Sequence, residues 1–389
     1  MAALAGAALA MGALAACGGG GDEPADDTST TEEAPPADDA GDVEEEPADE
    51  APPAANPADT LVGITMPARS LERWNRDGAK LQELLDGMGY QTDLQYAENE
   101  PETQVSQLEN QINAGAKILV VASIDSESLA PVLQTARDEG VIIIAYDRLL
   151  MNTPNVDYYA TFDNAGVGAM QGEYLAETLE LETAEGPIYF EAFAGSDDDN
   201  NAGLFFGGAW DVLQPYLESG VLECASGKCP ASKEQWTDVA IHAWDTAAAQ
   251  DEMETRLNSF YTDNKVQAVL SPNDSLALGI AQALDSAGYV VGEDYPLLTG
   301  QDGDEANVKN IIAGKQSMTV FKDTRLLAAA VADLVNQLAS GTAATTNASY
   351  NNDIQDVPTV QLDPVVVTAD SVQTILVDSD FYTAEQLGL

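Results

Sequence analysis

Residues 118–148 read ILVVASIDSESLAPVLQTARDEGVIIIAYDR, and this stretch contains the alternation that decides the fold. Residues 118–122 and 141–145 are continuous apolar runs of strand length, and the amphipathic stretch 129–137 lies between them. Continuous apolar runs indicate strands buried on both faces, as in a parallel sheet whose crossovers are helices. The stretch therefore predicts a strand–helix–strand unit.

The same rhythm continues on both sides of this unit. Further strands are expected at residues 61–64, 92–96, 188–193, 268–271, 297–299 and 318–321, and helices at 202–217, 247–261, 275–287 and 326–338. Repeated strand–helix units predict the α/β class, with parallel sheets covered on both faces. Residues 60–389 are enough for two cores, so we expect two Rossmann-like lobes.

The first residues of the chain are typical of an export signal. Residues 2–16 are small and apolar, the first charge is Asp22, and the run is short for a membrane span. The run ends in Leu14-Ala-Ala-Cys17, followed by four glycines, which resembles the lipobox of bacterial lipoproteins. In that class Cys17 carries lipid and residues 1–17 form the signal. A plain signal peptide with an incidental cysteine remains the alternative.

Residues 18–59 differ in composition from the rest of the chain. They are rich in Gly, Ala, Pro, Thr, Asp and Glu, and they contain no Lys, Arg or aromatic residue. Such a segment buries too little apolar area to offset its ordering entropy, so we expect a disordered acidic tether. An acidic interaction tail is the alternative.

The charge of the chain argues against a nucleic-acid partner. The formal net charge is -51, so phosphate backbones would be repelled. A transcriptional repressor built on similar lobes would need a basic DNA-binding headpiece, whereas an acidic segment precedes the predicted lobes here. After the signal, no apolar run is long enough for a transmembrane helix.

Apart from Cys17, the cysteines are Cys224 and Cys229, in Glu223-Cys-Ala-Ser-Gly-Lys-Cys-Pro230. Two cysteines without a nearby histidine do not complete a zinc site. In an exported protein we expect a short-loop disulfide, and two free thiols are the alternative.

Catalytic and cofactor signatures are scarce in the sequence. The chain has one histidine, His242, and a lone histidine is more often structural than catalytic. The sequence has no G-x-S-x-G, H-E-x-x-H, P-loop or complete G-x-G-x-x-G motif. We therefore expect a protein that is not an enzyme and that uses neither a cofactor nor a metal.

Polar residues gather where the predicted strands end. They occupy residues 146–148, 195–201, 271–274, 300–302 and 321–323. In open parallel sheets, ligands bind beyond the carboxyl ends of the strands, so these residues are candidates for one binding site.

Several of these segments are recognisable in order along the chain. They are Leu71-Glu-Arg-Trp74, Tyr146-Asp-Arg-Leu149, Tyr159-Ala-Thr-Phe-Asp-Asn164, Asp199-Asn-Asn-Ala202, Gly300-Gln-Asp302 and Phe321-Lys-Asp-Thr-Arg325. Together they resemble the periplasmic D-xylose-binding and multiple-sugar-binding proteins of the type I class, over residues 60–389. Each motif alone is weak, but their order and spacing match.

The resemblance implies two lobes that are joined by a three-strand hinge and close on a monosaccharide. The N-terminal lobe would comprise residues 60–162 and 323–355, and the C-terminal lobe 163–322 and 356–389. The implied sugar-binding residues are Arg73, Trp74, Asp147, Arg148, Asn201 (with Asn200 or Asp199 nearby), Trp244, Asn273, Asp274, Asp302 and Lys322. The implied partners are a xylose- or glucose-type aldose, the permease of an ABC importer, and the cell membrane through lipid on Cys17.

The chemistry of a pyranose agrees with this residue set. Indole rings suit its apolar C–H faces, and charged or amide side chains suit its hydroxyl rim. Purely structural roles remain as alternatives for three of these residues. Trp74 would be a core residue, Arg148 would pair with Asp147 on the surface, and Asp302 would be a turn residue. A sugar-sensing lipoprotein that reports to a membrane receptor is the alternative function.

Overall fold

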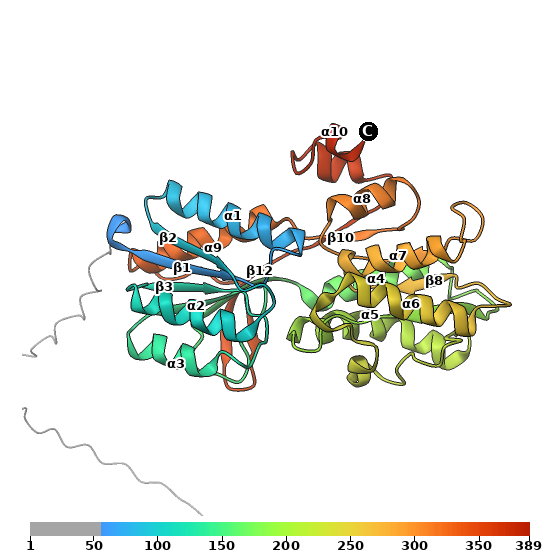
Figure 1. Cartoon of the computed structure of the whole chain (residues 1–389), viewed down its shortest axis with the longest axis horizontal. Helices are drawn as coiled ribbons and strands as arrows, with labels where there is room; N and C mark the ends of the chain where they lie inside the picture. The colour runs from blue at the N-terminus through green and yellow to red at the C-terminus, as the bar shows by residue number, and fades with distance from the viewer. Residues whose placement is uncertain (1–55) are drawn as a thin grey trace, which may run out of the picture. The chain divides into compact units, whose positions relative to one another are not determined.

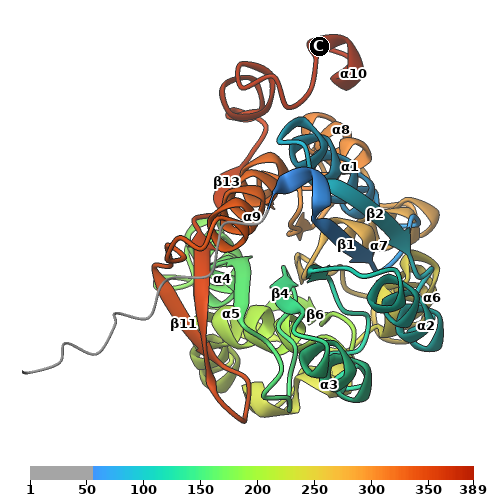
Figure 2. The same ribbon diagram turned by 90° about the vertical axis from the view of Figure 1, so that its left-hand side faces the viewer.

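The first lobe is built on a seven-stranded sheet in this computed structural model, which describes residues 56–389 (Figures 1 and 2). The sheet order is β11 (Ala348–Asn351), β12 (Asp356–Leu362), β5 (Tyr158–Phe162), β4 (Ile142–Tyr146), β3 (Ile118–Val121), β1 (Leu61–Met66) and β2 (Gln91–Tyr96). Neighbouring strands are parallel except β11 and β12. The parallel sheet predicted from the apolar runs is confirmed.

Helices cover both faces of this sheet. They are α1 (Glu72–Gly87) and α9 (Thr324–Ala339) on one face, and α2 (Pro101–Asn113) and α3 (Ala130–Asp138) on the other. Each pair has its own buried cluster against the sheet, around Leu81 and Val331 for the first pair and around Leu108 and Leu133 for the second. The core therefore lies in two layers, as burial of a parallel sheet on both faces requires.

The second lobe contains a smaller parallel sheet. Its order is β7 (Leu222–Glu223), β6 (Ile188–Ala192), β8 (Ala268–Leu270) and β9 (Leu297–Leu298). Its helices are α4 (Asn164–Thr178), α5 (Asn200–Ser219), α6 (Thr246–Phe260), α7 (Asp274–Ser286) and α8 (Glu305–Ile312). The second lobe also contains two antiparallel strands, β10 (Thr319–Phe321) and β13 (Val365–Val367). The short helix α10 (Ala384–Leu387) follows them at the end of the chain.

The chain passes between the two lobes three times: after β5, after β10 and after β12. The sequence-predicted boundary at residue 355 is displaced by one strand, because β12 pairs in parallel with β5 and so belongs to the first sheet. The last crossing therefore follows Leu362.

The predicted signal, Cys17 and nearly all of the predicted tether lie outside the described residues. Within residues 56–389, no helix is long and apolar enough to cross a membrane.

Candidate functional site

A cavity lies where strand ends of both sheets meet. Its walls come from the start of α1, the segments after β4, β9 and β10, and the starts of α5 and α7. The lining residues are Leu71, Arg73, Trp74, Asp147, Arg148, Asp199, Asn201, Phe205, Trp244, Asn273, Gln301, Asp302 and Lys322. All the predicted sugar-binding residues except Asp274 are in this set. Phe205 is not among the sequence candidates, whereas Leu71 and Gln301 belong to segments that were recognised in the sequence without a role for these two residues.

Arg73 is the centre of a buried charge network. Its guanidinium bonds to Asp147 at 2.8 Å, to Asp302 at 3.2 Å and to Asp77 at 3.2 Å. Lys322 bonds to Asp302 at 2.9 Å and lies 4.0 Å from Asp147. Asp147 follows a strand of the first sheet, whereas Asp302 follows a strand of the second, so the network joins the two lobes.

These cations control the ionisation of the carboxyl groups. Burial alone would raise the pKa of Asp147, but Arg73 and Lys322 outweigh it and hold that pKa below its usual value. Burial would also raise the pKa of Asp302, but the charges of Lys322 and Arg73 outweigh it and lower that pKa below its usual value. Both groups are therefore carboxylates at neutral pH, able to accept hydrogen bonds from hydroxyl groups.

A second ion pair crosses between the lobes. Arg148, which follows β4, bonds through Nε to Asp199 at 2.8 Å, and Asp199 caps α5 of the second lobe. Arg148 also donates to the carbonyl of Ser123 at 2.9 Å. Asn201 donates to the carbonyl of Asp147 at 2.8 Å. Arg148 is thus a buried interlobe residue, and its ion-pair partner is Asp199.

Two tryptophans line the cavity with their indole N–H groups unpaired among the described residues. Trp74 lies under the guanidinium groups of Arg73 and Arg148, at 4.4 Å and 5.3 Å from its ring centre. It also belongs to the core of the first lobe, so it combines both roles considered from the sequence. The Nε1 atoms of Trp74 and Trp244 are buried without a hydrogen-bond partner, as is the Oε1 atom of Gln301. Unpaired buried polar atoms are costly, so these atoms of cavity-lining residues are candidates for a hydrogen bond to a ligand.

Trp244 is held by an unusual backbone. Ala243 and Trp244 have φ values of 56° and 55°, a left-handed conformation that is uncommon outside glycine. The ring lies so close to Gly195 that a Cβ there would come within 2.0 Å of it. Phe205 packs at its side, with ring centres 6.4 Å apart. These contacts fix the indole at the cavity wall.

Asp274 lies behind the cavity wall and stabilises it through hydrogen bonds. It is the first residue of α7, directly after Asn273, which caps that helix and lines the cavity. The Asp274 carboxylate accepts bonds from Gln316 (2.8 Å), Thr319 (3.1 Å) and the backbone N–H of Asp304 (2.9 Å). It therefore stabilises the segment that carries Asp302, and it does not line the cavity.

The stability of the protein should depend on pH through Asp304. This carboxylate pairs with Arg76 at 3.0 Å, but burial and the neighbouring Asp302 raise its pKa from 3.8 to about 7. A carboxyl whose pKa is higher in the folded state contributes stability below its unfolded pKa and loses it as pH rises through the folded pKa.

We therefore expect wild type to lose up to about 4 kcal/mol relative to Asp304→Asn between about pH 4 and pH 8, because three pKa units correspond to about this free energy. Urea unfolding of both proteins at steps of pH gives the difference. Parallel stability curves would contradict the prediction.

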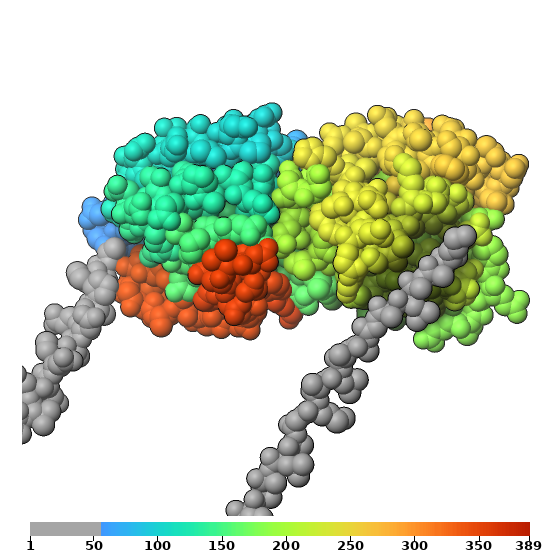
Figure 3. All heavy atoms as spheres, turned by 90° about the horizontal axis from the view of Figure 1, so that it is seen from below, coloured from blue at the N-terminus to red at the C-terminus, as the bar shows by residue number. Residues whose placement is uncertain are grey.

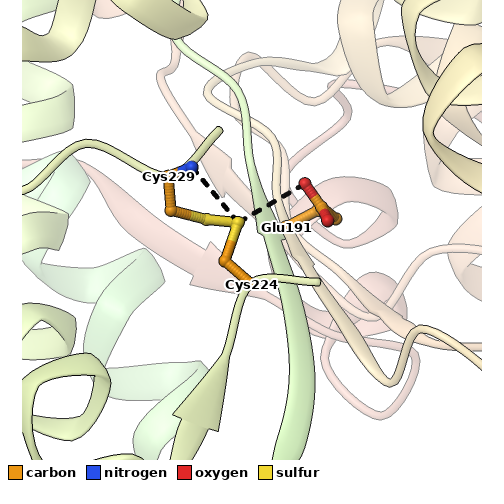
Figure 4. Close-up of side chains that lie close together, drawn as sticks. All are labelled: Glu191, Cys224 and Cys229. Atoms are coloured by element: carbon orange, nitrogen blue, oxygen red, sulfur yellow. Dashed lines mark hydrogen bonds between the residues drawn. A yellow bond between two sulfur atoms is a disulfide. The ribbon is translucent and has the colours of Figure 1, made fainter. Parts of the chain in front are cut away.

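Cys224 and Cys229 are joined by a disulfide (Figure 4), as the sequence predicts. Sγ of Cys224 lies 3.7 Å from the carboxylate of Glu191, which is fully buried on β6. Glu191 also pairs with Arg256 at 2.9 Å and accepts a bond from Ser226 at 2.7 Å. None of these residues lines the cavity, so the disulfide belongs to a separate polar cluster.

Replacing both cysteines with serine should therefore leave ligand affinity nearly unchanged. The enclosed loop is short, so the chain-entropy relation gives only about 2 kcal/mol of stabilisation. Urea unfolding and ligand titration of the double variant measure the two effects. A tenfold loss of affinity in a folded variant would refute the separation of the disulfide from the site.

Comparison with known proteins gives a consistent result. Residues 62–343 match the family described as "Periplasmic binding protein domain". A multiple sugar-binding periplasmic receptor of Rhizobium radiobacter is 45% identical over 84% of this chain and 92% of its own length. The D-xylose-binding periplasmic protein of Escherichia coli K12 is 33% identical over 86% of this chain and 94% of its own length.

Solved structures agree with these relatives. An ABC transporter solute-binding protein of Clostridium phytofermentans with bound β-D-glucose is 47% identical, with a TM-score of 0.81, over 84% of this chain and all of its own. A carbohydrate transporter solute-binding protein of Chloroflexus aurantiacus with D-glucose is 34% identical, with a TM-score of 0.76, over 84% of this chain and 97% of its own.

Proposed function

This chain belongs to the periplasmic binding protein family of sugar receptors, and from this premise we propose that it binds a glucose- or xylose-type aldopyranose in the interlobe cavity and is not an enzyme. The proposed sugar-binding residues are Arg73, Trp74, Asp147, Arg148, Asn201, Trp244, Asn273, Asp302 and Lys322. Asp199 and Gln301 are added to this set because they line the same cavity.

The observation that carries the proposal is that one cavity is lined both by two indoles, whose N–H groups have no partner among the described residues, and by several charged side chains. Indole rings suit the C–H faces of a pyranose, and carboxylates, guanidinium and ammonium groups suit its hydroxyls. Trp74 and Trp244 come from different lobes, as do Asp147 and Asp302. A single sugar could therefore contact both lobes at once.

The burial of the cavity walls supports a closing motion. Residues of both lobes line the cavity, and the side chains of Arg73, Asp147, Asp302 and Lys322 are less than a tenth exposed. A sugar that reaches these side chains therefore requires the lobes to move apart and to return around the ligand. The crossings after β5, β10 and β12 are the segments that would bend, and a ligand that bridges both lobes would favour closure.

The test is a thermal-shift screen over xylose, glucose, galactose and arabinose, followed by calorimetry on the best ligand. A sugar that binds only the folded state raises the melting temperature, and the stabilisation grows with the logarithm of the ratio of its concentration to its dissociation constant. Sugar alcohols of the same carbon number are the controls, because they have similar hydroxyl groups without the pyranose ring. The absence of binding by any aldose would reject the proposal.

We further propose delivery of the sugar to an ABC importer from a lipid-anchored, extracytoplasmic position. Support comes from the Leu14-Ala-Ala-Cys17 segment and from the relatives of solved structure, which are described as solute-binding proteins of ABC and carbohydrate transporters. Mass spectrometry of the membrane fraction should find diacylglycerol on Cys17, and a Cys17→Ser variant should be released from the membrane. A mature chain that lacks Cys17, or that keeps it unmodified, would contradict lipid anchoring while leaving sugar binding untouched.

A further inference from the structure

A group of metal-ligating side chains lies within two residues, along the chain, of Asp199 and Trp244, which line the cavity. Asp197 and Asp198 belong to the segment between β6 and α5, and His242 begins the short helical turn that ends in Trp244. Their nearest ligand atoms all lie within 4.8 Å of one another. His242 is the only histidine in the chain, and its Nδ1 atom lies 2.8 Å from Oδ1 of Asp197.

We propose that Asp197, Asp198 and His242 bind a divalent transition-metal ion of the zinc type, with water completing the coordination shell. Zinc bonds to histidine nitrogen and carboxylate oxygen at about 2.0–2.2 Å, so two ligands of a tetrahedral zinc site are about 3.4 Å apart. Nδ1 of His242 and Oδ1 of Asp197 are 2.8 Å apart and share a hydrogen bond. A bound ion would replace the proton of that hydrogen bond, and the two atoms would move slightly apart. The imidazole nitrogen favours zinc, copper or nickel over calcium or magnesium.

The surroundings favour a cation. The side chains of His242 and Asp197 are 74% and 55% exposed, so an ion can reach them. Two cavities adjoin the site. One is lined by Asp125, Glu127 and Asp353 in addition to Asp197 and Asp198, and no Lys or Arg is among its lining residues. The other is lined by Asp198 and His242 and also by Arg148, whose charge is paired with Asp199. The excess of carboxylates raises the local concentration of cations.

Hydrogen bonds connect the segments that carry the proposed ligands. The N–H of Ala243 donates to Oγ of Ser196 at 2.7 Å, which joins the two loops beside the ligand atoms. The N–H of Ser126, from the first lobe, donates to the carbonyl of Asp198 at 3.2 Å. A bound ion would add a further link between the loop that carries Asp199 and the turn that carries Trp244.

Calorimetric titration of the full chain with zinc chloride tests the site. The protein is first dialysed against a chelator, freed of any polyhistidine tag, and kept without reductant so that Cys224 and Cys229 stay oxidised. We expect one zinc ion per chain. We also expect His242→Gln and Asp197→Asn each to weaken zinc binding at least tenfold.

The matched control is Asp353→Asn, which removes the same charge from the neighbouring cavity without removing a proposed ligand. It should change zinc affinity less than twofold. Copper(II) in place of zinc gives a second readout, because the electron paramagnetic resonance spectrum should show coupling to one imidazole nitrogen, and this coupling should vanish in His242→Gln.

The proposal would be overturned if His242→Gln bound zinc as tightly as wild type. It would also be overturned if Asp353→Asn lost as much zinc affinity as the ligand variants, because the ion would then be attracted by the acidic surface in general. No zinc binding by wild type would overturn it as well. The titration contains no sugar, so its outcome is independent of the proposed sugar binding.

Discussion

Replacing Arg73 with methionine should lower the free energy of unfolding by about 3–5 kcal/mol, the cost expected when one partner of a buried ion pair is removed. Arg73 is the shared partner of Asp77, Asp147 and Asp302, and all of these side chains are less than a tenth exposed. Methionine keeps an apolar side chain next to Trp74, but it removes the positive charge that is paired with these three buried carboxylates. Urea unfolding at neutral pH measures the loss.

The matched control is Arg69→Met. Arg69 pairs with Glu98 at 2.6 Å, but the two side chains are 59% and 51% exposed. Exposed pairs contribute about 0–1 kcal/mol, so this variant should be nearly as stable as wild type. The cost of Arg73→Met should shrink in acid, where the buried carboxyl groups can take up protons. Equal stability of the two variants at neutral pH would contradict the central role of Arg73.

The second large effect concerns ligand affinity. Trp244→Ala, Arg148→Ala and Asp302→Ala should each weaken binding of the preferred aldose at least tenfold, which corresponds to about 1.4 kcal/mol. Loss of Trp244 removes a stacking surface, and loss of either charged group leaves its hydroxyl or ionic partners unsatisfied in a desolvated cavity. Calorimetry on folded variants gives the affinities.

Trp236→Ala is the control for loss of an indole. Trp236 is partly buried in the second lobe beside Gly203 of α5, and it does not line the sugar cavity. Its replacement should leave the affinity for sugar within about twofold of wild type. If all three cavity variants bind as well as wild type, the proposed site is wrong.

The fold was predictable because buried parallel strands have a distinctive pattern. The runs at 118–122 and 141–145 are continuously apolar, and they became β3 and β4. Strand β12 lacks this pattern, because it contains Pro358 and alternates polar with apolar residues. Its membership of the first sheet depends on pairing with β5, far away in the sequence, so local pattern could not reveal it.

The cavity was predictable to the extent that its residues follow strands. Asp147 and Lys322 stand directly after β4 and β10, and Asp302 follows β9 within a few residues, where side chains of an open parallel sheet meet. Neighbouring residues were harder to separate: Asn273 lines the cavity, whereas Asp274 does not. Phe205 lies on a helix with apolar spacing, which is equally typical of a core residue.

The three passages of the chain between the lobes also determine when each lobe can complete its folding during synthesis. Strand β12 and helix α9 belong to the first lobe, yet they are synthesised after the whole second sheet. Helix α9 supplies Leu327 and Val331 to the same buried cluster as Trp74 and Leu81 of α1. A nascent chain that stops before residue 323 therefore leaves that apolar surface open. Such long-range closure slows folding, so the first lobe should complete its core only after residues 324–339 have been synthesised.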